Sequence, residues 1–338
     1  SERIAGELEF TKSSDISAKD IAGNSKKKKF VTVEKMGIPG LEVGELAALV
    51  TDLDKLDPGI DGILGSNYFQ FFIVGIDYRK PSLLLSGRAP AAGEETLVVP
   101  FEKNMKFGFA PTAECLVDDV AMSCVIETGA PGNFTVPSAR ISKLPGYKQN
   151  RYIQSDGSLS HGLFGSKGDD IVVGVSRFRM SGLELIDVAM GSNHSDDGIM
   201  TIGKAFLDDY RVTIDYPAEK LYLAPLSNAS PSFPFYTCGF GMAEDEEGIT
   251  RVNGIWPQSA AVKAGIERGD EVSAVGGKAP DAYSMLELMD MFFAAAEVPV
   301  VVKKRSGEEK RIVVPREDLS PYVGSEITTV KYSLDTSL

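Results

Sequence analysis

Short apolar runs, many with polar residues at alternate positions, are separated by Gly, Pro and Asp along most of the chain. This pattern predicts a protein built mainly of β-strands. Residues 122–126 form one such run, which we expect to be a buried strand in a hairpin that turns at Asp118 and Asp119. A short helix is expected over residues 137–144, ended by the Pro-Gly pair that follows.

One part of this pattern occurs twice. The block Asp-Gly-Ile-Leu-Gly at Asp61 is followed by Ile-Asp-Tyr at Asp77, and Asp-Gly-Ile-Met-Thr-Ile-Gly at Asp197 is followed by Ile-Asp-Tyr at Asp215. Asp77 and Asp215 lie 138 residues apart, and each copy ends in an apolar strand. A repeat of this length indicates two homologous lobes made of short strands.

The pattern changes after a Ser/Pro-rich stretch at residues 227–234, which we interpret as a domain boundary. Beyond it, a helix is predicted over about residues 282–295 from four apolar residues at helical spacing: Met285, Leu288, Met289 and Phe292. Two strands are expected after this helix, at residues 298–303 and 310–314. A polar tail follows over residues 317–338, with weak strand signals.

Composition and charge exclude several classes of protein. With 43% hydrophobic and 25% charged residues the chain is globular, and no apolar run reaches the ~18 residues of a membrane-spanning helix. A formal net charge of -13 repels phosphate backbones, so no nucleic-acid partner is expected. No metal or organic cofactor is implied, because the three cysteines lack Cys-x-x-Cys spacing and both histidines, His161 and His194, lie in polar stretches that predict solvated loops.

A carboxylate stands at the end of the strand predicted for residues 122–126. Glu127 is followed by Thr128 and Gly129, where glycine lets the chain turn sharply. With the hairpin before it, and with the short helix and the Asp-Gly-Ile and Ile-Asp-Tyr blocks after it, this loop resembles that of the retropepsin-like aspartyl proteases, most closely their bacterial two-lobed members. The resemblance covers most of residues 1–225, and it implies that Glu127, Thr128 and Gly129 are catalytic.

Peptide hydrolysis of this kind uses two carboxylates about 3 Å apart that share one proton. One acts as the base for water, and the other donates to the carbonyl oxygen. In the family each lobe supplies an Asp, whereas here Glu127 projects one methylene further. The first lobe shows no acid-Thr-Gly, and the repeat spacing puts the corresponding loop before Ser1. Asp15 and Asp20, near the start, are not followed by Thr-Gly, and we interpret them as surface residues.

Three alternatives therefore remain for the second carboxylate. The chain lost its first catalytic loop by trimming or processing, it never had one, or two copies meet as a homodimer in which each supplies Glu127. The corresponding functions are an aspartic endopeptidase and a non-catalytic peptide-binding protein that keeps the protease fold.

Two glycine-containing turns correspond to the flaps of the family, the hairpins that close over the substrate. Gly23 and Asn24 stand in the first, before four consecutive lysines at residues 26–29, and Gly165 and Ser166 stand in the second. We interpret the lysines as part of a solvated hairpin tip.

Residues 236–315 resemble a PDZ domain. The loop of the family that binds a peptide C-terminus through its backbone N–H groups corresponds to four residues: Gly239, Phe240, Gly241 and Met242. The resemblance implies that a peptide adds as a strand beside this loop, with its last side chain against Tyr283, Leu286 and Met289 of the predicted helix.

Together these observations predict a mostly β protein of two homologous aspartic-protease-like β-barrel lobes followed by a PDZ domain with one main groove helix. The expected divisions are residues 1–88 for the first lobe, 89–226 for the second, 235–316 for the PDZ domain and 317–338 for the tail. The expected partners are peptide or protein substrates and ligands, among them C-terminal tails. The resemblance implies a bacterial periplasm or cell envelope.

Overall fold

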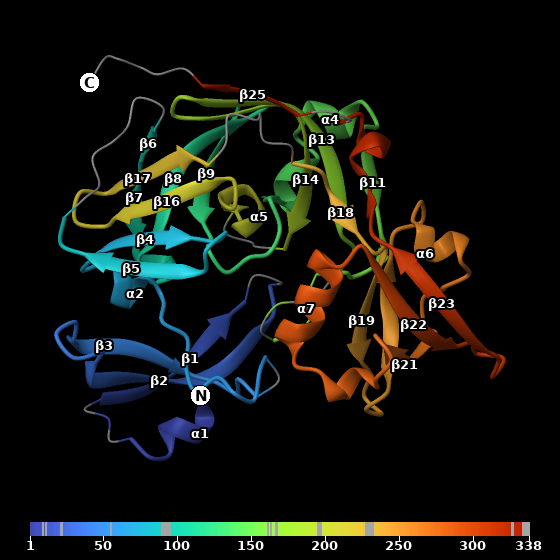
Figure 1. The fold of residues 1–338 in the computed structure, drawn as a ribbon, viewed down its shortest axis with the longest axis horizontal. Coiled ribbons are helices and arrows are strands. Elements are labelled where there is room, and N and C mark those ends of the chain that lie inside the picture. The colour runs from blue at the N-terminus through green and yellow to red at the C-terminus, as the bar shows by residue number, and fades with distance from the viewer. Residues whose placement is uncertain are drawn as a thin grey trace.

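The computed structural model describes residues 1–338 except 9, 11, 21–22, 55, 89–95, 161, 163, 166–167, 195–197, 227–232, 326–327 and 333–338. Strands dominate the described part of the chain (Figure 1), which confirms the prediction of a mostly β protein. No helix in this part is long and apolar enough to cross a membrane.

Six strands of the second half, residues 89–226, close into a barrel. In ring order they are β8 (Ala110–Val117), β9 (Val120–Ile126), β15 (Met200–Ile202), β10 (Phe134–Pro137), β14 (Leu183–Asn193) and β13 (Ile171–Met180). The ring closes where Phe178 of β13 pairs with Val117 of β8, and both side chains are fully buried. The predicted turn at Asp118 and Asp119 is confirmed, with both residues at positive φ.

Further strands pair on the outside of this barrel. They are β7 (Glu102–Asn104) on β8, β11 (Tyr152–Gln154) on β13 and β25 (Thr329–Tyr332) on β14. The tail of the chain thus returns to the barrel. Two short helices follow β10, α3 (Ser138–Ile141) and α4 (Pro145–Lys148), so the predicted helix is shorter than expected. Pro145 begins a helix instead of ending one, because its fixed φ suits the first helical turn.

A five-stranded sheet joins the two copies of the repeat. Its order is β5 (Ser82–Ser86), β4 (Ile73–Asp77), β16 (Tyr210–Asp215), β17 (Lys220–Pro225) and β6 (Leu97–Pro100). At its centre Gly75 pairs with Thr213, which lies 138 residues later, the offset of the sequence repeat. The helices α2 (Ser66–Phe69) and α5 (Lys204–Leu207) keep the same offset.

The first half, residues 1–88, contains no second barrel among its described residues. After α1 (Glu2–Ala5), an antiparallel sheet of three strands forms from β1 (Lys12–Lys19), β2 (Ser25–Met36) and β3 (Val43–Val50). The expectation of a β-barrel in this half is therefore wrong for the described residues, since three strands are too few to close a barrel.

The four lysines lie within strand β2 and have partners. Lys27 pairs with Asp15 at 3.2 Å and Lys28 with Glu2 at 3.0 Å. Lys26 and Lys29 lie over the rings of Phe164 and Phe10. Lys26, Lys27 and Lys29 are exposed and thus solvated as predicted, but all four lysines lie in the strand that follows the turn and not at the hairpin tip.

The C-terminal module, residues 235–316, is a separate sheet packed around its own apolar core. Its elements are β18 (Tyr236–Thr237), β19 (Phe240–Glu244), β20 (Thr250–Ile255), α6 (Ala260–Lys263), β21 (Glu271–Val275), α7 (Met285–Ala294), β22 (Glu297–Lys303) and β23 (Glu309–Pro315). The predicted helix and the two strands after it are thus confirmed. The core side of α7 differs slightly from the predicted stripe, and consists of Leu288, Met291, Phe292 and Ala295, the last residue capping the helix.

The remaining elements are short: β12 (Asp156–Gly157), β24 (Glu317–Asp318) and the 3₁₀ turns Met105–Phe107, Pro280–Ala282 and Ser320–Val323. Most of the Ser/Pro stretch predicted as a boundary lies outside the described residues. Phe233, near its end, is buried in the barrel core against Phe134 and Phe206. The barrel core therefore extends closer to the C-terminal module than the composition indicated.

Candidate functional site

The Glu127 loop, residues 127–133, leaves the barrel at the end of β9. The backbone N–H of Glu127 donates to the carbonyl of Ile202 at 2.9 Å, and that of Ala130 donates back to the carbonyl of Glu127 at 3.2 Å. Because β9 pairs in parallel with β15, the loop begins beside the segment that leads into α5. The sheet thus holds Glu127 at a strand terminus, as the sequence predicted.

The second copy of the repeat holds this loop through hydrogen bonds from the start of α5. The N–H groups at the start of α5 donate to loop carbonyls: Gly203 to Asn133 at 2.7 Å and Lys204 to Ala130 at 2.7 Å. A Cβ at Gly203 would lie 2.2 Å from the carbonyl oxygen of Gly132. Only glycine therefore lets the helix and the loop approach this closely.

Glu127 is accessible to solvent at this loop, yet protein atoms crowd its carboxyl group. Burial raises the pKa of Glu127, while a hydrogen bond from the backbone N–H of Gly129 lowers it by a smaller amount. Gly129 lies close enough that a Cβ there would be 3.7 Å from Oε1 of Glu127. The carboxyl group thus stays protonated to a higher pH than an ordinary glutamate, and it remains reachable from solvent.

Two tyrosines from the repeated Ile-Asp-Tyr blocks reach across the central sheet. The hydroxyl of Tyr78 donates to the carbonyl of Thr128 at 3.4 Å, and the Lys204 ammonium lies 5.2 Å from the centre of its ring. The hydroxyl of Tyr216 donates to Oγ of Ser66 at 3.0 Å. Ser66 and Lys204 are 138 residues apart, so each tyrosine contacts the first residue of the opposite helix.

The negative charge of Glu127 contributes to a raised pKa of both tyrosines. Burial raises the pKa of Tyr216 to about 12, with a smaller contribution from the Glu127 carboxylate. Burial also raises the pKa of Tyr78, with smaller contributions from Asp208 and Glu127. Tyr78 contacts the Glu127 loop at Thr128, and Tyr216 contacts the start of α2; the sequence analysis missed both contacts. The signal was present in the two Ile-Asp-Tyr blocks.

The structure brings the two predicted flap turns together. Asp20 accepts a hydrogen bond from the backbone N–H of Asn24 in its own turn at 2.8 Å, and one from Phe164 in the second turn at 2.7 Å. Nδ2 of Asn24 lies 3.9 Å from the position of a Cβ at Gly165. Ser166 lies outside the described residues, as does His161. Gly23 lies in the first turn at positive φ.

Asp20 thus joins two hairpins that are 144 residues apart. Asp20 is half-buried, and each of its carboxylate oxygens accepts a backbone hydrogen bond, a structural role that the interpretation as a surface residue did not include. Asp15 is exposed and pairs with Lys27, as a surface residue does.

A buried carboxylate fixes the base of the hairpin that contains the second predicted flap turn. Asp170 accepts hydrogen bonds from the backbone N–H groups of Leu159 and Ser160 and from the Ser160 hydroxyl, and Nε2 of His194 lies 3.4 Å away. Burial alone would raise the pKa of Asp170, but the contacts with His194, Ser160 and Leu159 hold it below its ordinary value. His194 is therefore largely buried beside a carboxylate, not solvated as predicted.

The cysteines do not form a metal site. Cys115 and Cys124 form a disulfide across β8 and β9, and Cys238 is a free thiol buried in the C-terminal module. Within the described residues no group of three or more His, Cys, Asp or Glu side chains is arranged to hold a metal ion.

The predicted peptide-binding residues of the C-terminal module lie along β19 and α7. Gly239 has φ +86°, and a Cβ there would lie 2.4 Å from Cβ of Ser259, so the turn requires glycine. Phe240, Gly241 and Met242 begin β19, whose one described neighbour is β20.

On α7, Leu286 is 38% exposed, and its N–H donates to the carbonyl of Leu56 in the first half at 3.2 Å. Met289 is partly exposed, and the hydroxyl of Tyr283 donates to the carbonyl of Val275 at 3.0 Å. A peptide-binding role for these residues stays a prediction.

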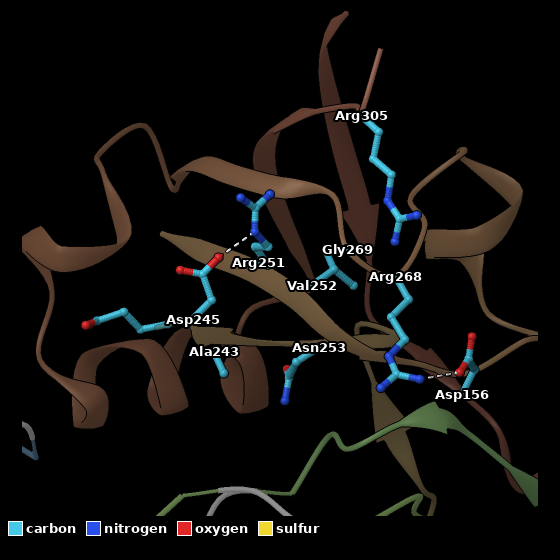
Figure 2. Close-up of a pocket in the computed structure, with 10 residues that line it drawn as sticks. Asp156, Ala243, Asp245, Arg251, Val252, Asn253, Arg268, Gly269 and Arg305 are labelled. Atoms are coloured by element: carbon cyan, nitrogen blue, oxygen red, sulfur yellow. Dashed lines mark hydrogen bonds and ion pairs between the residues drawn. The ribbon is translucent and has the colours of Figure 1, made fainter. Parts of the chain in front are cut away.

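A pocket of about 550 Å³ opens elsewhere on the C-terminal module (Figure 2). Three arginines line it, but Arg251 pairs with Asp245 at 2.6 Å and Arg268 with Asp156 at 2.8 Å. None of the residues predicted for a site lines this pocket. Its largely compensated charges favour a structural contact between Asp156 of the second half and the module.

No protein family and no characterised protein sequence matches the chain. Among solved structures, the chain is similar to a retropepsin-like aspartic protease from Rickettsia conorii, with a TM-score of 0.28 and 13% sequence identity. The match covers 40% of this chain and 96% of that protein. The structural likeness is weak.

Proposed function

We propose that this chain is an aspartic-type endopeptidase-family protein, made of two related lobes and a PDZ-type module, that holds an extended peptide at the Glu127 loop. The observation that carries this proposal is the loop itself: an acid-Thr-Gly turn at the end of a barrel strand, supported by α5 through Gly203 and solvent-accessible. The central pairing of Gly75 with Thr213 supports the division into related lobes.

The chemistry assigned to Glu127 is that of a general base. Its ionised form takes a proton from water, and the water oxygen attacks the peptide carbonyl carbon. The carbonyl oxygen then needs a proton or a strong hydrogen bond, which a second, protonated carboxyl group supplies in this class of reaction. Because burial raises the pKa of Glu127, its ionised base form becomes available only at a higher pH than in an ordinary glutamate.

A second candidate function, peptide binding without hydrolysis, is favoured by the surroundings of Gly65. Gly65 occupies the position equivalent to Gly203, but the atom nearest to its added Cβ is a side-chain oxygen of Asn67 at 3.2 Å and not a loop carbonyl. In the described part of the first half, no acid-Thr-Gly loop lies on α2. A single carboxylate cannot be base and acid at the same moment.

Cleavage of an unbiased peptide mixture between pH 3 and 8 separates these functions. The wild-type chain is compared with Glu127→Gln, which is nearly the same size and cannot act as a base, and with Glu127→Asp, which shortens the side chain by one methylene. Hydrolysis that is lost in Glu127→Gln supports the endopeptidase. A rate that rises more steeply than the first power of protein concentration identifies a second copy as the source of the other carboxylate.

The same peptides are tested for binding to Glu127→Gln. Binding without hydrolysis by any of the three proteins supports the non-catalytic function. Neither binding nor hydrolysis by the wild-type chain overturns the proposal.

A further inference from the structure

The second flap hairpin is built into the sheet of the C-terminal module. The flap arm, residues 156–160, contains β12, and β12 pairs with Ile255 and Gly254 of β20. On their other edge these two residues pair with Phe240 and Gly241 of β19. One strand of the module thus carries the flap arm on one side and the predicted peptide-binding strand on the other.

The contact between the flap arm and the module is close at the level of the backbone. A Cβ at Gly254 would lie 2.2 Å from the carbonyl oxygen of Ser158, and one at Gly157 would lie 2.1 Å from that of Asn253. The ion pair between Arg268 and Asp156 adds a contact at 2.8 Å. Neither surface has room to slide over the other, so we expect the arm to follow any displacement of β20.

The flap arm is connected in turn to the flap tip. Asp170 binds the N–H groups of Leu159 and Ser160 at 2.6 and 2.9 Å, which ties the end of the arm to the returning strand of the hairpin. Beyond it, Gly162 and Gly165 pair with each other. Phe164, between them, donates its N–H to Asp20 in the first half. Contacts of the described residues 156–160, 162, 164, 165 and 170 thus link β20 to the opposite flap turn.

We propose that the C-terminal module sets the position of the flap turns, because the arm of the second flap is a strand of the module's own sheet. The contact between Phe164 and Asp20 forms when the module holds the arm in place, and it loosens when the arm is displaced. Only the statement that the flaps enclose a peptide rests on the proposed function. The coupling itself is a property of the fold, and by linkage it acts in both directions.

Hydrogen–deuterium exchange of the full chain tests this coupling without any substrate. Gly254→Ala places a methyl group against the carbonyl of Ser158 and should displace the arm. We expect the amide of Phe164 to exchange at least tenfold faster in this variant. Gly87→Ala is the matched control, since the added methyl group meets no atom of the described residues within 4 Å, and it should leave exchange at Phe164 unchanged.

Arg268→Ala is the second variant, because Gly254→Ala could unfold the module. It removes the exposed ion pair with Asp156, and about threefold faster exchange at Phe164 is expected. In the reverse direction, Asp20→Ala should speed exchange in the ladder between β12 and β20. Unchanged exchange at Phe164 in Arg268→Ala and in a folded Gly254→Ala, with faster exchange at Gly157, overturns the proposal. Loss of peptide cleavage or binding does not affect either readout.

Discussion

The two copies of the repeat form the same local structure in different surroundings. Gly65 (φ −100°, ψ −179°) and Gly203 (φ −102°, ψ −177°) precede α2 and α5 with nearly the same backbone conformation. At Gly203 the Glu127 loop lies on the helix start, whereas the described surroundings of Gly65 contain no such loop. The local fold is thus encoded by the repeat itself, while the chemistry depends on a segment outside it.

The largest expected difference between the copies is the effect of an added methyl group. Gly203→Ala should destabilise the fold by about 3 kcal/mol, because the Cβ would lie 2.2 Å from a backbone oxygen in a packed region. Gly65→Ala, the matched change, should cost less than about 1 kcal/mol, since it meets only the end of the Asn67 side chain. Chemical denaturation measures both values. Equal losses of stability in the two variants would show that Gly65 also packs closely against a backbone atom.

The next comparison is between a buried and an exposed carboxylate in the two predicted flap hairpins. Asp170→Asn should cost about 2 kcal/mol, because it removes a buried charged acceptor. Asp15→Asn in the first hairpin should change stability by less than about 0.5 kcal/mol, because its pair with Lys27 is exposed.

The stability difference between wild type and Asp170→Asn should also depend on pH. The lowered pKa of Asp170 means that its contribution is present above the ordinary Asp pKa of about 3.9 and is lost as the pH falls through the folded-state pKa. The stability difference between wild type and Asp170→Asn should therefore shrink in acid. A difference that stays constant down to pH 2 would contradict the charged network.

A smaller difference in stability is expected between variants of the two tyrosines, Tyr78 and Tyr216. Tyr216→Phe removes a 3.0 Å hydrogen bond to Ser66 from a side chain that is 2% exposed, and should cost about 1 kcal/mol. Tyr78→Phe removes a longer bond of 3.4 Å to Thr128 and should cost about 0.5 kcal/mol. Thermal or denaturant unfolding of the two variants tests this order. The reverse order would place the stronger contact between the two copies of the repeat on the Glu127 side.

The smallest expected effect is a change in the pKa values of Tyr78 and Tyr216. Glu127→Gln removes the charge that contributes to the raised pKa of Tyr78 and Tyr216, so both pKa values should fall. Tyr222, whose pKa is raised by burial and Asp215, serves as the internal control and should not change. NMR titration of ring-carbon-labelled tyrosine gives all three values. An unchanged pKa at both tyrosines would mean that the Glu127 carboxylate points away from them.

Local features of the fold were predictable, because their causes lie within a few residues. The left-handed turn at Asp118 and Asp119 follows from residue type, and α7 follows from its apolar spacing. The carboxylate at a strand end was likewise visible as Glu127-Thr128-Gly129. The repeat further predicted that residues 138 apart take equivalent positions.

Features that depend on distant partners were not predictable. Asp20 and Phe164 are 144 residues apart. Asp170 directly precedes β13, and His194 directly follows β14. Nothing in the local sequence of His194 shows that a carboxylate will lie beside it. The number of strands in the first half also escaped prediction, because barrel closure is a property of the whole sheet and not of any one strand.

The return of the chain to the barrel has a consequence for how the molecule can be divided. After the C-terminal module, Leu319 and Val323 are buried beside Trp256, Arg151 binds the carbonyls of Val323 and Gly324, and β25 pairs with β14. For protein engineering, the C-terminal module is therefore a domain inserted between two segments of the barrel and not a domain added at the end of the chain. A truncation before residue 317 would leave an open strand edge on β14, so dissection should excise residues 235–316 and rejoin the flanks.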